Sequence, residues 1–321
     1  MNELTKRLEK IDFLRKKLDS ILIFSNDTNF FYFTNCSLES SAFFYDFNKP
    51  IIFTNEMEAR RAKLSWVKNI EVIKDSKKLF SHKGHIGINF TKTSIAAKKQ
   101  MKFFAVDISK NLEQARMIKT NYEIKQIRKA CEITKEIFKK TEKMQNRKTT
   151  EKELKALIEY EISRKADIAF PAIVASGAGT AIPHYQPQNK KIIKPLLLDI
   201  GVKYNGYCSD VTRTYNSPYE SKIKKIISEI ENKLKPGISA NSLDVLVRKL
   251  MGKDKKYFLH GIGHGLGIEV HERPWFGKKV SNVLKAGMVI AIEPGLYKQT
   301  GCRIENDYLI TDDGFEKLTD F

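Results

Sequence analysis

The chain has 321 residues and is 41% hydrophobic, so it is long enough for two domains that each have their own core. Its four cysteines are widely spaced and form no CxxC pair, which argues against a disulfide framework or a thiolate zinc site and favours a reducing, cytoplasmic setting. The net charge of +19 comes mostly from lysines spread along the chain beside glutamates, so it indicates solvated helix faces and not a nucleic-acid site.

Residues 1–115 are predicted to form a small α/β domain. Their first 18 residues have the pattern of a charged amphipathic helix and not of a cleavable signal peptide. No acidic and histidine cluster occurs here, so His82 and His85 are expected at the surface. Alternating strand-like and helical runs are typical of an α/β domain. Strands are expected at 21–25, 30–34, 41–45, 50–54, 69–74 and 85–90, and a helix at 56–64.

Residues 116–321 are predicted to form a second domain that begins with long amphipathic helices. From Asn121 onwards, apolar residues recur every three or four positions as far as Ile137. Thr150 and Glu153 have the spacing of a capping box and predict the start of a second helix. The sequence then becomes rich in glycine, proline and histidine and later strand-like, so the whole chain is assigned to the α/β (α+β) class. No apolar run approaches the roughly 20 residues of a membrane span, so no membrane partner is predicted.

Two carboxylates in the second domain end apolar runs where a charge is unfavourable. Asp199 closes the run PLLLD, and Glu293 closes the run VIAIE. A carboxylate at the end of a buried strand is costly unless it is paired or binds a metal ion. The same region holds four of the six histidines, in glycine-rich or proline-flanked segments: His184, His260, His264 and His271.

A first hairpin is predicted around Asn205-Gly206, the usual signal for a two-residue type I′ turn. This turn places Asp199 opposite Thr212, and Asp210 becomes a diagonal neighbour of Asp199 on the same face, about 7–8 Å away at the backbone. One residue more or less in the turn would put the two carboxylates on opposite faces. The turn therefore predicts that they converge.

A second pair of carboxylates, Glu293 and Glu305, depends on the length of another turn. A three-residue loop over 298–300 would set Glu293 opposite Glu305, whereas a four-residue loop would separate them. Pro294 has no backbone N–H to donate to a neighbouring strand, so it implies a sheet edge or a bulge beside Glu293. The sequence leaves both loop lengths open.

Four carboxylates and one imidazole would form a ligand set that is rich in hard oxygen donors: Asp199, Asp210, Glu293, Glu305 and His264. Their four negative charges balance two divalent cations, and such donors favour Mn²⁺, or a similar first-row ion such as Co²⁺, over thiolate-loving metals. Two ions about 3.5–4 Å apart can share one water, lower its pKa and polarise a carbonyl group. The set therefore predicts hydrolytic chemistry.

Six segments carry a resemblance to a known family: KTNYEIKQIRKA at 119–130, PHY at 183–185, DIGVKYNGYCSDVTRT at 199–214, HGIGHGLGIEVHERP at 260–274, GMVIAIEPGLY at 287–297 and GCRIEN at 301–306. Together they resemble the pita-bread metallopeptidases, and within that family the Xaa-Pro dipeptidases (prolidases) and Xaa-Pro aminopeptidases. The resemblance implies a creatinase-like N-terminal domain over 1–115 and a pita-bread catalytic domain over 116–321. It also implies a homodimer that hydrolyses Xaa-Pro bonds in di- or oligopeptides.

Matched position by position, the resemblance assigns the metal ligands. Asp199 would chelate one metal ion, and Asp210 and Glu305 would bridge both ions. His264 and Glu293 would complete the coordination of the second ion. Glu293 would also shuttle a proton as a general base.

The resemblance further implies roles on the substrate side of the site. His184 and His271 would hold the scissile carbonyl group and stabilise the tetrahedral intermediate. Arg303 would contact the substrate, and His260 would border the proline pocket.

The sequence departs from the family pattern at several places. Gly179 stands where the family's SGxNxxxPH motif has asparagine, and Asn306 replaces an acidic residue that often follows the bridging glutamate. The loop between the two glutamates of the second pair is shorter than usual. Thr212 and Arg213 are expected to support Asp210 and not to act on the substrate.

Three alternatives to a dipeptidase stay open. An Xaa-Pro aminopeptidase would admit a longer chain beyond proline, and the compact length favours the dipeptidase. Methionine aminopeptidase shares the fold and the metal set, but the GCRIE context of Glu305 and the large preceding domain favour the proline branch. A non-catalytic relative that binds protein or nucleic acid would have lost ligands, whereas this chain keeps all five ligand positions together with His184 and His271.

Overall fold

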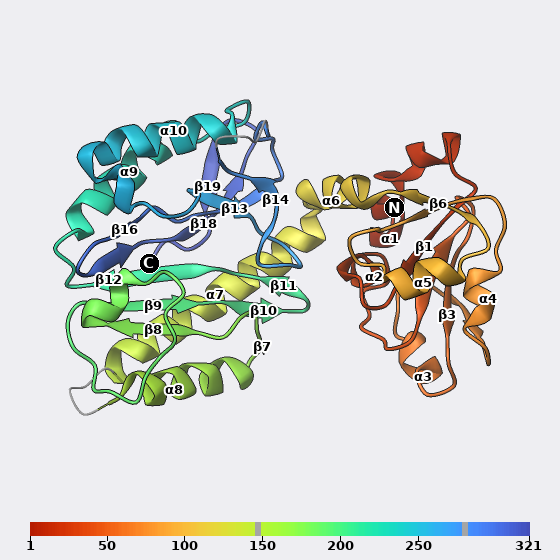
Figure 1. Ribbon diagram of the computed structural model, residues 1–321, viewed down its shortest axis with the longest axis horizontal. Coiled ribbons are helices and arrows are strands. Elements are labelled where there is room, and N and C mark those ends of the chain that lie inside the picture. Colours follow the sequence, from red (N-terminus) through yellow and green to blue (C-terminus); the bar gives the residue numbers. More distant parts are fainter. Residues whose placement is uncertain (145–148, 278–281) are drawn as a thin grey trace. The chain divides into compact units, whose positions relative to one another are not determined.

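The computed structural model describes residues 1–144, 149–277 and 282–321. The chain forms two compact units, Met1–Arg116 and Met117–Phe321 (Figure 1). Among the described residues, no helix combines the length and the apolar character that crossing a bilayer requires.

The first unit is built on a six-stranded mixed sheet with the strand order β4-β3-β2-β1-β5-β6. The β1–β2 and β2–β3 pairs are antiparallel, and the other three pairs are parallel. Its strands are β1 (Ser20–Phe24), β2 (Ala42–Tyr45), β3 (Pro50–Thr54), β4 (Asn69–Val72), β5 (His85–Ile88) and β6 (Phe104–Asp107). Its helices are α1 (Glu3–Glu9), η1 (Asp12–Lys16), α2 (Thr28–Thr34), α3 (Ala59–Ala62), α4 (Lys77–Phe80) and α5 (Ile95–Gln100), and α6 (Ser109–Met117) leads into the second unit.

Two predictions for the first unit are wrong. The aromatic run 30–34, predicted as a strand, lies in helix α2, because the Asp27 side chain accepts from the Asn29 backbone at the N-terminus and Asn35 ends the helix in a left-handed conformation. Capping and burial of this aromatic face outweigh the β-propensity of the residues. His82 is half-buried with its ring stacked 4.5 Å from Phe44, whereas His85 is exposed as predicted.

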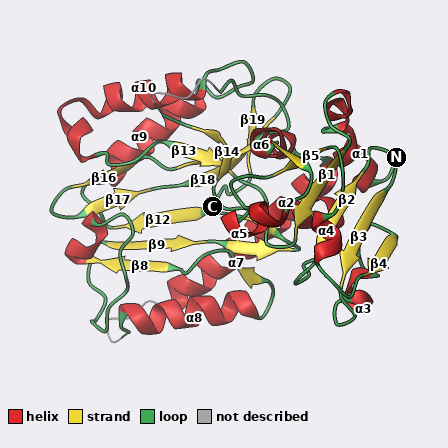
Figure 2. Cartoon of the chain, turned by 45° about the vertical axis from the view of Figure 1, so that its right-hand side comes forward, coloured by secondary structure: helices red, strands yellow, loops and turns green. Residues whose placement is uncertain are grey.

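The second unit contains two pairs of helices on opposite sides of its strands (Figures 1 and 2). Helices α7 (Asn121–Met144) and α8 (Glu151–Ser163) pack on one apolar core, and α9 (Glu220–Glu231) and α10 (Ala240–Met251) pack on another. The predicted capping box at the start of α8 is confirmed. The two cores leave the polar ends of the intervening strands free to form a site.

The strands of the second unit form a three-stranded sheet β12-β9-β8, a small sheet β11-β10-β7, a five-stranded sheet β14-β13-β15-β18-β19 and the ribbon β16-β17. Short 3-10 helices η2 (Gly177–Ala181) and η3 (Gly252–Tyr257) lie in the connections. The strands are β7 (Asp167–Ile168), β8 (Ile173–Ser176), β9 (Leu196–Ile200), β10 (Val202–Tyr204), β11 (Tyr207–Cys208), β12 (Val211–Tyr215), β13 (Gly263–Gly265), β14 (Glu272–Trp275), β15 (Val289–Ile292), β16 (Gly295–Tyr297), β17 (Gly301–Arg303), β18 (Asn306–Ile310) and β19 (Phe315–Lys317).

Strands β9 to β12 form the first hairpin, which has the predicted register. Asp199 pairs with Thr212, and the same register continues to the turn. Asn205 and Gly206 both have positive φ, at 46° and 84°, as a type I′ turn requires. The prediction that Asp199 and Asp210 occupy the same face is therefore confirmed.

Strands β15 to β18 form the second hairpin, whose loop has three residues. Tyr297 pairs with Gly301 on the two sides of the loop, and the register is the same beyond the break in the ladder, where Ile292 pairs with Asn306. Glu293 therefore lies opposite Glu305. The structure selects the first of the two alternatives that the sequence left open.

Candidate active site

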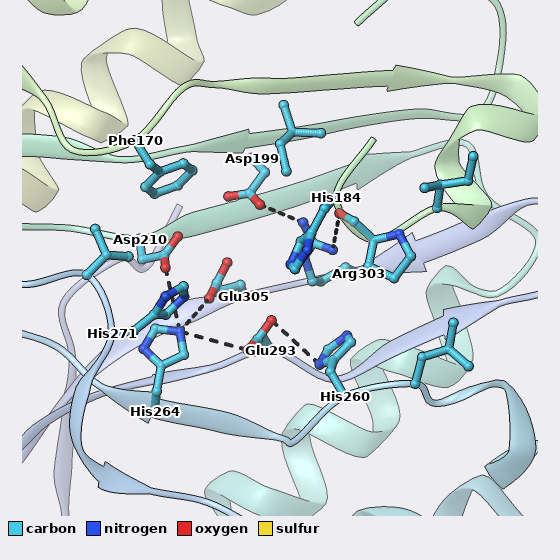
Figure 3. A pocket seen from close by; sticks show the side chains of 15 residues that line it. Phe170, His184, Asp199, Asp210, His260, His264, His271, Glu293, Arg303 and Glu305 are labelled. Carbon is cyan, nitrogen blue, oxygen red and sulfur yellow. Dashed lines mark hydrogen bonds and ion pairs between the residues drawn. The ribbon is translucent and has the colours of Figure 1, made fainter. Parts of the chain in front are cut away.

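All nine residues that the sequence singled out line one cavity of about 590 Å³ in the second unit (Figure 3). They come from both hairpins, from the loop after η2, from β13 and the segment before it, and from the segment before β14. The nine are His184, Asp199, Asp210, His260, His264, His271, Glu293, Arg303 and Glu305. Apolar side chains line the rest of the cavity: Phe170, Ile173, Ile182, Pro183, Leu259 and Val270.

Three overlapping groups of these residues could each hold a metal ion. Within each group, one donor atom per residue lies within 4.8 Å of the others. The groups are Asp199–Asp210–Glu305, His264–Glu293–Glu305 and Asp210–His264–His271. Asp210, Glu305 and His264 each belong to two groups, and of these the two carboxylates have a pair of oxygen atoms with which they could bridge two ions.

His264 on β13 is oriented as a metal ligand. Its Nε2 atom lies 3.6 Å from Asp210, 3.8 Å from Glu293 and 3.9 Å from Glu305. Its Nδ1 atom lies 3.2 Å from the Gly265 carbonyl oxygen, to which it donates as the neutral tautomer. Burial lowers the pKa of His264 to about 3, so Nε2 keeps its lone pair toward the carboxylates at neutral pH.

The electrostatics of the carboxylates fit a cation at this place. Burial, and then the neighbouring Glu305, raise the pKa values of Asp210 and Glu293 well above their usual range. Burial and Asp199 raise the pKa of Glu305 to about 7. The Asp199 Oδ1 atom is buried and has no hydrogen-bond partner among the described residues. Buried carboxylates this close together are unfavourable as free anions, and divalent cations would remove the penalty.

Thr212 and Arg213, which were predicted to support Asp210, contact Glu305 instead. The Thr212 hydroxyl group donates to Glu305 Oε2 at 2.8 Å, and the Arg213 guanidinium group donates to the Glu305 carbonyl oxygen at 2.5 Å. Asp210 is held by a residue that the sequence reasoning missed: the Asp210 backbone N–H donates to the buried carboxylate of Asp307 at 3.0 Å. Asp307 follows Glu305 by two positions, and because residues two apart lie on one face of an extended segment, this spacing could have drawn attention to it.

Arg303 and His260 are joined through a second residue that was missed, Tyr297. The Arg303 guanidinium group donates to the Tyr297 hydroxyl oxygen at 2.9 Å and to Asp199 Oδ2 at 2.5 Å. The Tyr297 hydroxyl lies 2.8 Å from His260 Nε2, and His260 Nδ1 lies 2.7 Å from the Gly261 carbonyl oxygen. Burial lowers the pKa of His260 to about 4, so the neutral ring donates to Gly261 and accepts from Tyr297.

The two predicted substrate-side histidines face the same cavity. His184 lies in the loop after η2 and is exposed, and His271 lies just before β14 with its ring edge-on to His264 at 4.3 Å between centroids. Burial lowers the pKa of His271, so its ring is neutral at neutral pH. Both side chains can therefore reach a molecule in the cavity.

Strands enclosed between two pairs of helices (Figure 1) and carrying a cluster of carboxylates and imidazoles indicate a metal-dependent hydrolase. Residues 125–312 match the model of metallopeptidase family M24. An Xaa-Pro dipeptidase of Pyrococcus furiosus is 33% identical over 98% of this chain and 97% of its own length. An uncharacterised peptidase of Methanocaldococcus jannaschii is 42% identical over 66% of each protein. The crystal structure of the prolidase from Pyrococcus horikoshii, 31% identical, covers 99% of this chain and 98% of that one with a TM-score of 0.87.

The chain belongs to metallopeptidase family M24. The predicted family is confirmed. The predicted fold class, a small N-terminal α/β domain followed by a pita-bread catalytic domain, is confirmed as well.

Proposed function

We propose that this protein is a dinuclear-metal exopeptidase that hydrolyses Xaa-Pro dipeptides. One observation carries the proposal: all five ligand positions and both substrate-side histidines face a single cavity. The similarity to an Xaa-Pro dipeptidase over nearly the full length of both chains supports the substrate class. The apolar part of the cavity wall suits the proline ring of such a substrate.

Five residues would hold the two ions: Asp199, Asp210, His264, Glu293 and Glu305. Bound divalent ions would supply a water of lowered pKa and polarise the scissile carbonyl group. Glu293 lines the cavity and its side chain is 20% exposed, so its carboxylate could take up a proton and return it to the leaving amine.

The substrate would be bound and oriented by side chains outside the ligand set. His184 and His271 would donate to the carbonyl oxygen as negative charge develops on it. His260 would border the proline ring, and its neutral state avoids a buried charge beside this ring. Arg303 has protein partners on both terminal nitrogens, so its contact with substrate would come from the face of the guanidinium group that lines the cavity.

The native metal, the assembly and the location of the protein also belong to this proposal. Hard carboxylate donors favour Mn²⁺, with Co²⁺ as a substitute. A homodimer follows from the resemblance to the family. The cysteines are all free in the structure, which agrees with the reducing conditions of the cytoplasm.

The proposal is tested by assaying the purified protein with Mn²⁺ and with Co²⁺ against an Xaa-Pro dipeptide and the matching Xaa-Pro-Yaa tripeptide. We expect hydrolysis of the dipeptide and much weaker cleavage of the tripeptide. Similar efficiency on the tripeptide would make the protein an Xaa-Pro aminopeptidase. A protein that binds no divalent ion and cleaves neither peptide would contradict the enzymatic proposal.

A further inference from the structure

One fully buried carboxylate in the second unit lies outside the metal site but touches the loop that carries His184. Glu151 is the first residue of α8, and its side chain is 0% exposed. Its Oε1 atom accepts from the Ser176 backbone N–H at 2.8 Å and from the Ser176 hydroxyl at 2.7 Å. Its Oε2 atom accepts from the Tyr185 hydroxyl at 3.0 Å and from the Gln188 backbone N–H at 2.9 Å. The Lys190 ammonium group lies 3.4 Å away.

These contacts hold the segment 176–190 at both ends, and His184 lies between them. Ser176 precedes η2, whereas Tyr185 and Gln188 follow His184. The first turn of α8 reinforces the attachment, because the Glu151 backbone N–H donates to the Lys190 carbonyl oxygen at 3.0 Å. The His184 loop is thus fastened to the N-terminal end of α8.

Tyr185 links the Glu151 carboxylate to His184, the residue next to it in the sequence. Its ring is buried, and it packs so closely on Gly179 that a Cβ atom there would lie 2.9 Å from the ring. Tyr185 therefore cannot move toward η2, and its hydroxyl group is fixed by Glu151. On the other side of His184, the Pro183 carbonyl oxygen accepts from Arg303 at 3.2 Å. The backbone of His184 is held between these two anchors.

We propose that Glu151 is a positioning residue that acts through His184: it fixes the loop from which the His184 imidazole reaches the cavity. The proposal rests on the proposed function, in which His184 binds the scissile carbonyl group. A misplacement of about 1 Å can lower turnover on the order of a hundredfold. Glu151 would therefore contribute to catalysis although it does not line the cavity.

The test is a double-mutant cycle between Glu151→Gln and His184→Ala, with kcat, KM and bound metal measured on the Mn²⁺-loaded enzyme. We expect Glu151→Gln to lower kcat/KM by about tenfold or more while metal content is kept. In the double variant this loss should disappear, because the residue through which Glu151 acts is already absent. Losses that multiply would show a merely structural role and overturn the proposal.

A matched control is Glu123→Gln. Glu123 is also a buried carboxylate in the first turn of its helix, and it accepts from the Thr120 backbone N–H at 2.9 Å and from the Tyr207 hydroxyl at 3.4 Å. Neither of these two partners lies in the segment 176–190, so any loss of activity in Glu123→Gln should multiply with that of His184→Ala. Tyr185→Phe removes one of the Glu151 contacts and replaces Glu151→Gln in the cycle if that variant does not fold.

A second readout does not depend on the enzymatic activity. In protein labelled with ¹⁵N-histidine, the His184 signal, assigned with His184→Ala, should shift or broaden in Glu151→Gln and in Tyr185→Phe. The signals of His82 and His85 should not change. An unchanged His184 signal in both variants would contradict the positioning role. If the wild-type protein cleaves no Xaa-Pro peptide, the proposed function fails, whereas the spectrum still decides whether Glu151 positions His184.

Discussion

The two hairpins of the catalytic unit each bring two carboxylates into the site, but they do so by different means. The first hairpin keeps one uninterrupted register from β9 to the turn, and the residues of the turn itself determine that register. In the second hairpin Pro294 interrupts the strand, and the Glu293 and Glu305 N–H groups donate outside the hairpin, to the carbonyl oxygens of Ile262 and Thr212. One half of the site is therefore specified locally, and the other half by tertiary contacts.

The hydrogen bond from Glu305 to the Thr212 carbonyl oxygen also joins the two hairpins to each other. The Arg303 side chain makes a second connection, since it donates to Asp199 Oδ2 and to Thr212 Oγ1 at 3.0 Å. Glu293 and Glu305 form a non-hydrogen-bonded pair of the second hairpin, because the next pair is the one joined by the Ile304 N–H and the Pro294 carbonyl oxygen, 3.5 Å apart. Their own N–H groups therefore point out of this hairpin and are available for the contacts that bring the two carboxylate pairs together.

The largest effect is expected when a bridging carboxylate is removed from either hairpin. Asp210→Ala and Glu305→Ala should each lower kcat/KM by roughly a thousandfold or more, because each residue belongs to two of the three candidate metal groups. Bound metal should fall in parallel. Asp312→Ala, in an exposed turn, is the control and should behave as wild type. Retained activity in either bridging variant would rule out a dinuclear centre shared by the hairpins.

A smaller loss is expected from a residue that belongs to neither hairpin. His271→Ala should lower kcat by about a hundredfold, because a donor to the developing oxyanion is lost. Metal content, measured by elemental analysis, should stay near that of wild type, since the five hairpin and β13 ligands remain. Loss of metal would instead make His271 a ligand, as its group with Asp210 and His264 would allow.

The difference between the hairpins also explains how far the sequence could predict the site. The Asn205-Gly206 signal determined the register of the first hairpin, and the structure has that register. The loop of the second hairpin has no such signal, so Glu293 and Glu305 could not be placed from the residues alone. Asp307 and Tyr297 were missed because their roles depend on segments far away in the sequence.

The fold was predictable to a similar extent. Helical periodicity and the capping box at Thr150 gave the layer of α7 and α8 correctly, since those signals are local. The aromatic run of α2 was misassigned, because β-propensity describes a half-buried surface and not the cap at Asp27 that determines the helix. In both domains, sequence reasoning succeeded where a short segment determines its own structure.

The next effect concerns the protons that both hairpins hold when no metal ion is bound. The raised pKa values of Asp210, Glu293 and Glu305 mean that these carboxyls carry protons at a pH where they would be ionised in the unfolded chain. The metal-free fold therefore loses stability as the pH rises toward and through about 7. The lowered pKa values of His260 and His264 act in the opposite direction, but only as the pH falls below about 6.5.

Between about pH 6.5 and about pH 8, the carboxyls with raised pKa values therefore dominate the difference in bound protons between the folded and the unfolded state. The melting temperature of the protein in chelator should fall between about pH 6.5 and about pH 8. The stabilisation by added Mn²⁺ should grow over the same range, because fewer protons compete for the ligands. Differential scanning fluorimetry with chelator and with Mn²⁺ measures both trends. A metal-induced shift that does not depend on pH would contradict the assignment of raised carboxyl pKa values.

The smallest expected effect is on the turns themselves. Gly206 has a φ of 84°, so Gly206→Ala should destabilise the protein by about 1 kcal/mol through backbone strain in the first hairpin. Gln299→Ala, in the loop of the second hairpin, should change stability very little, because Gln299 has no positive φ and β17 is held instead by contacts such as Gly301 N–H to Thr180 Oγ1 at 2.8 Å. Urea unfolding of the metal-free proteins measures both differences. If both variants lose the same free energy of unfolding, the second turn also determines the register of its hairpin. The two hairpins would then not differ in whether local residues or tertiary contacts specify them.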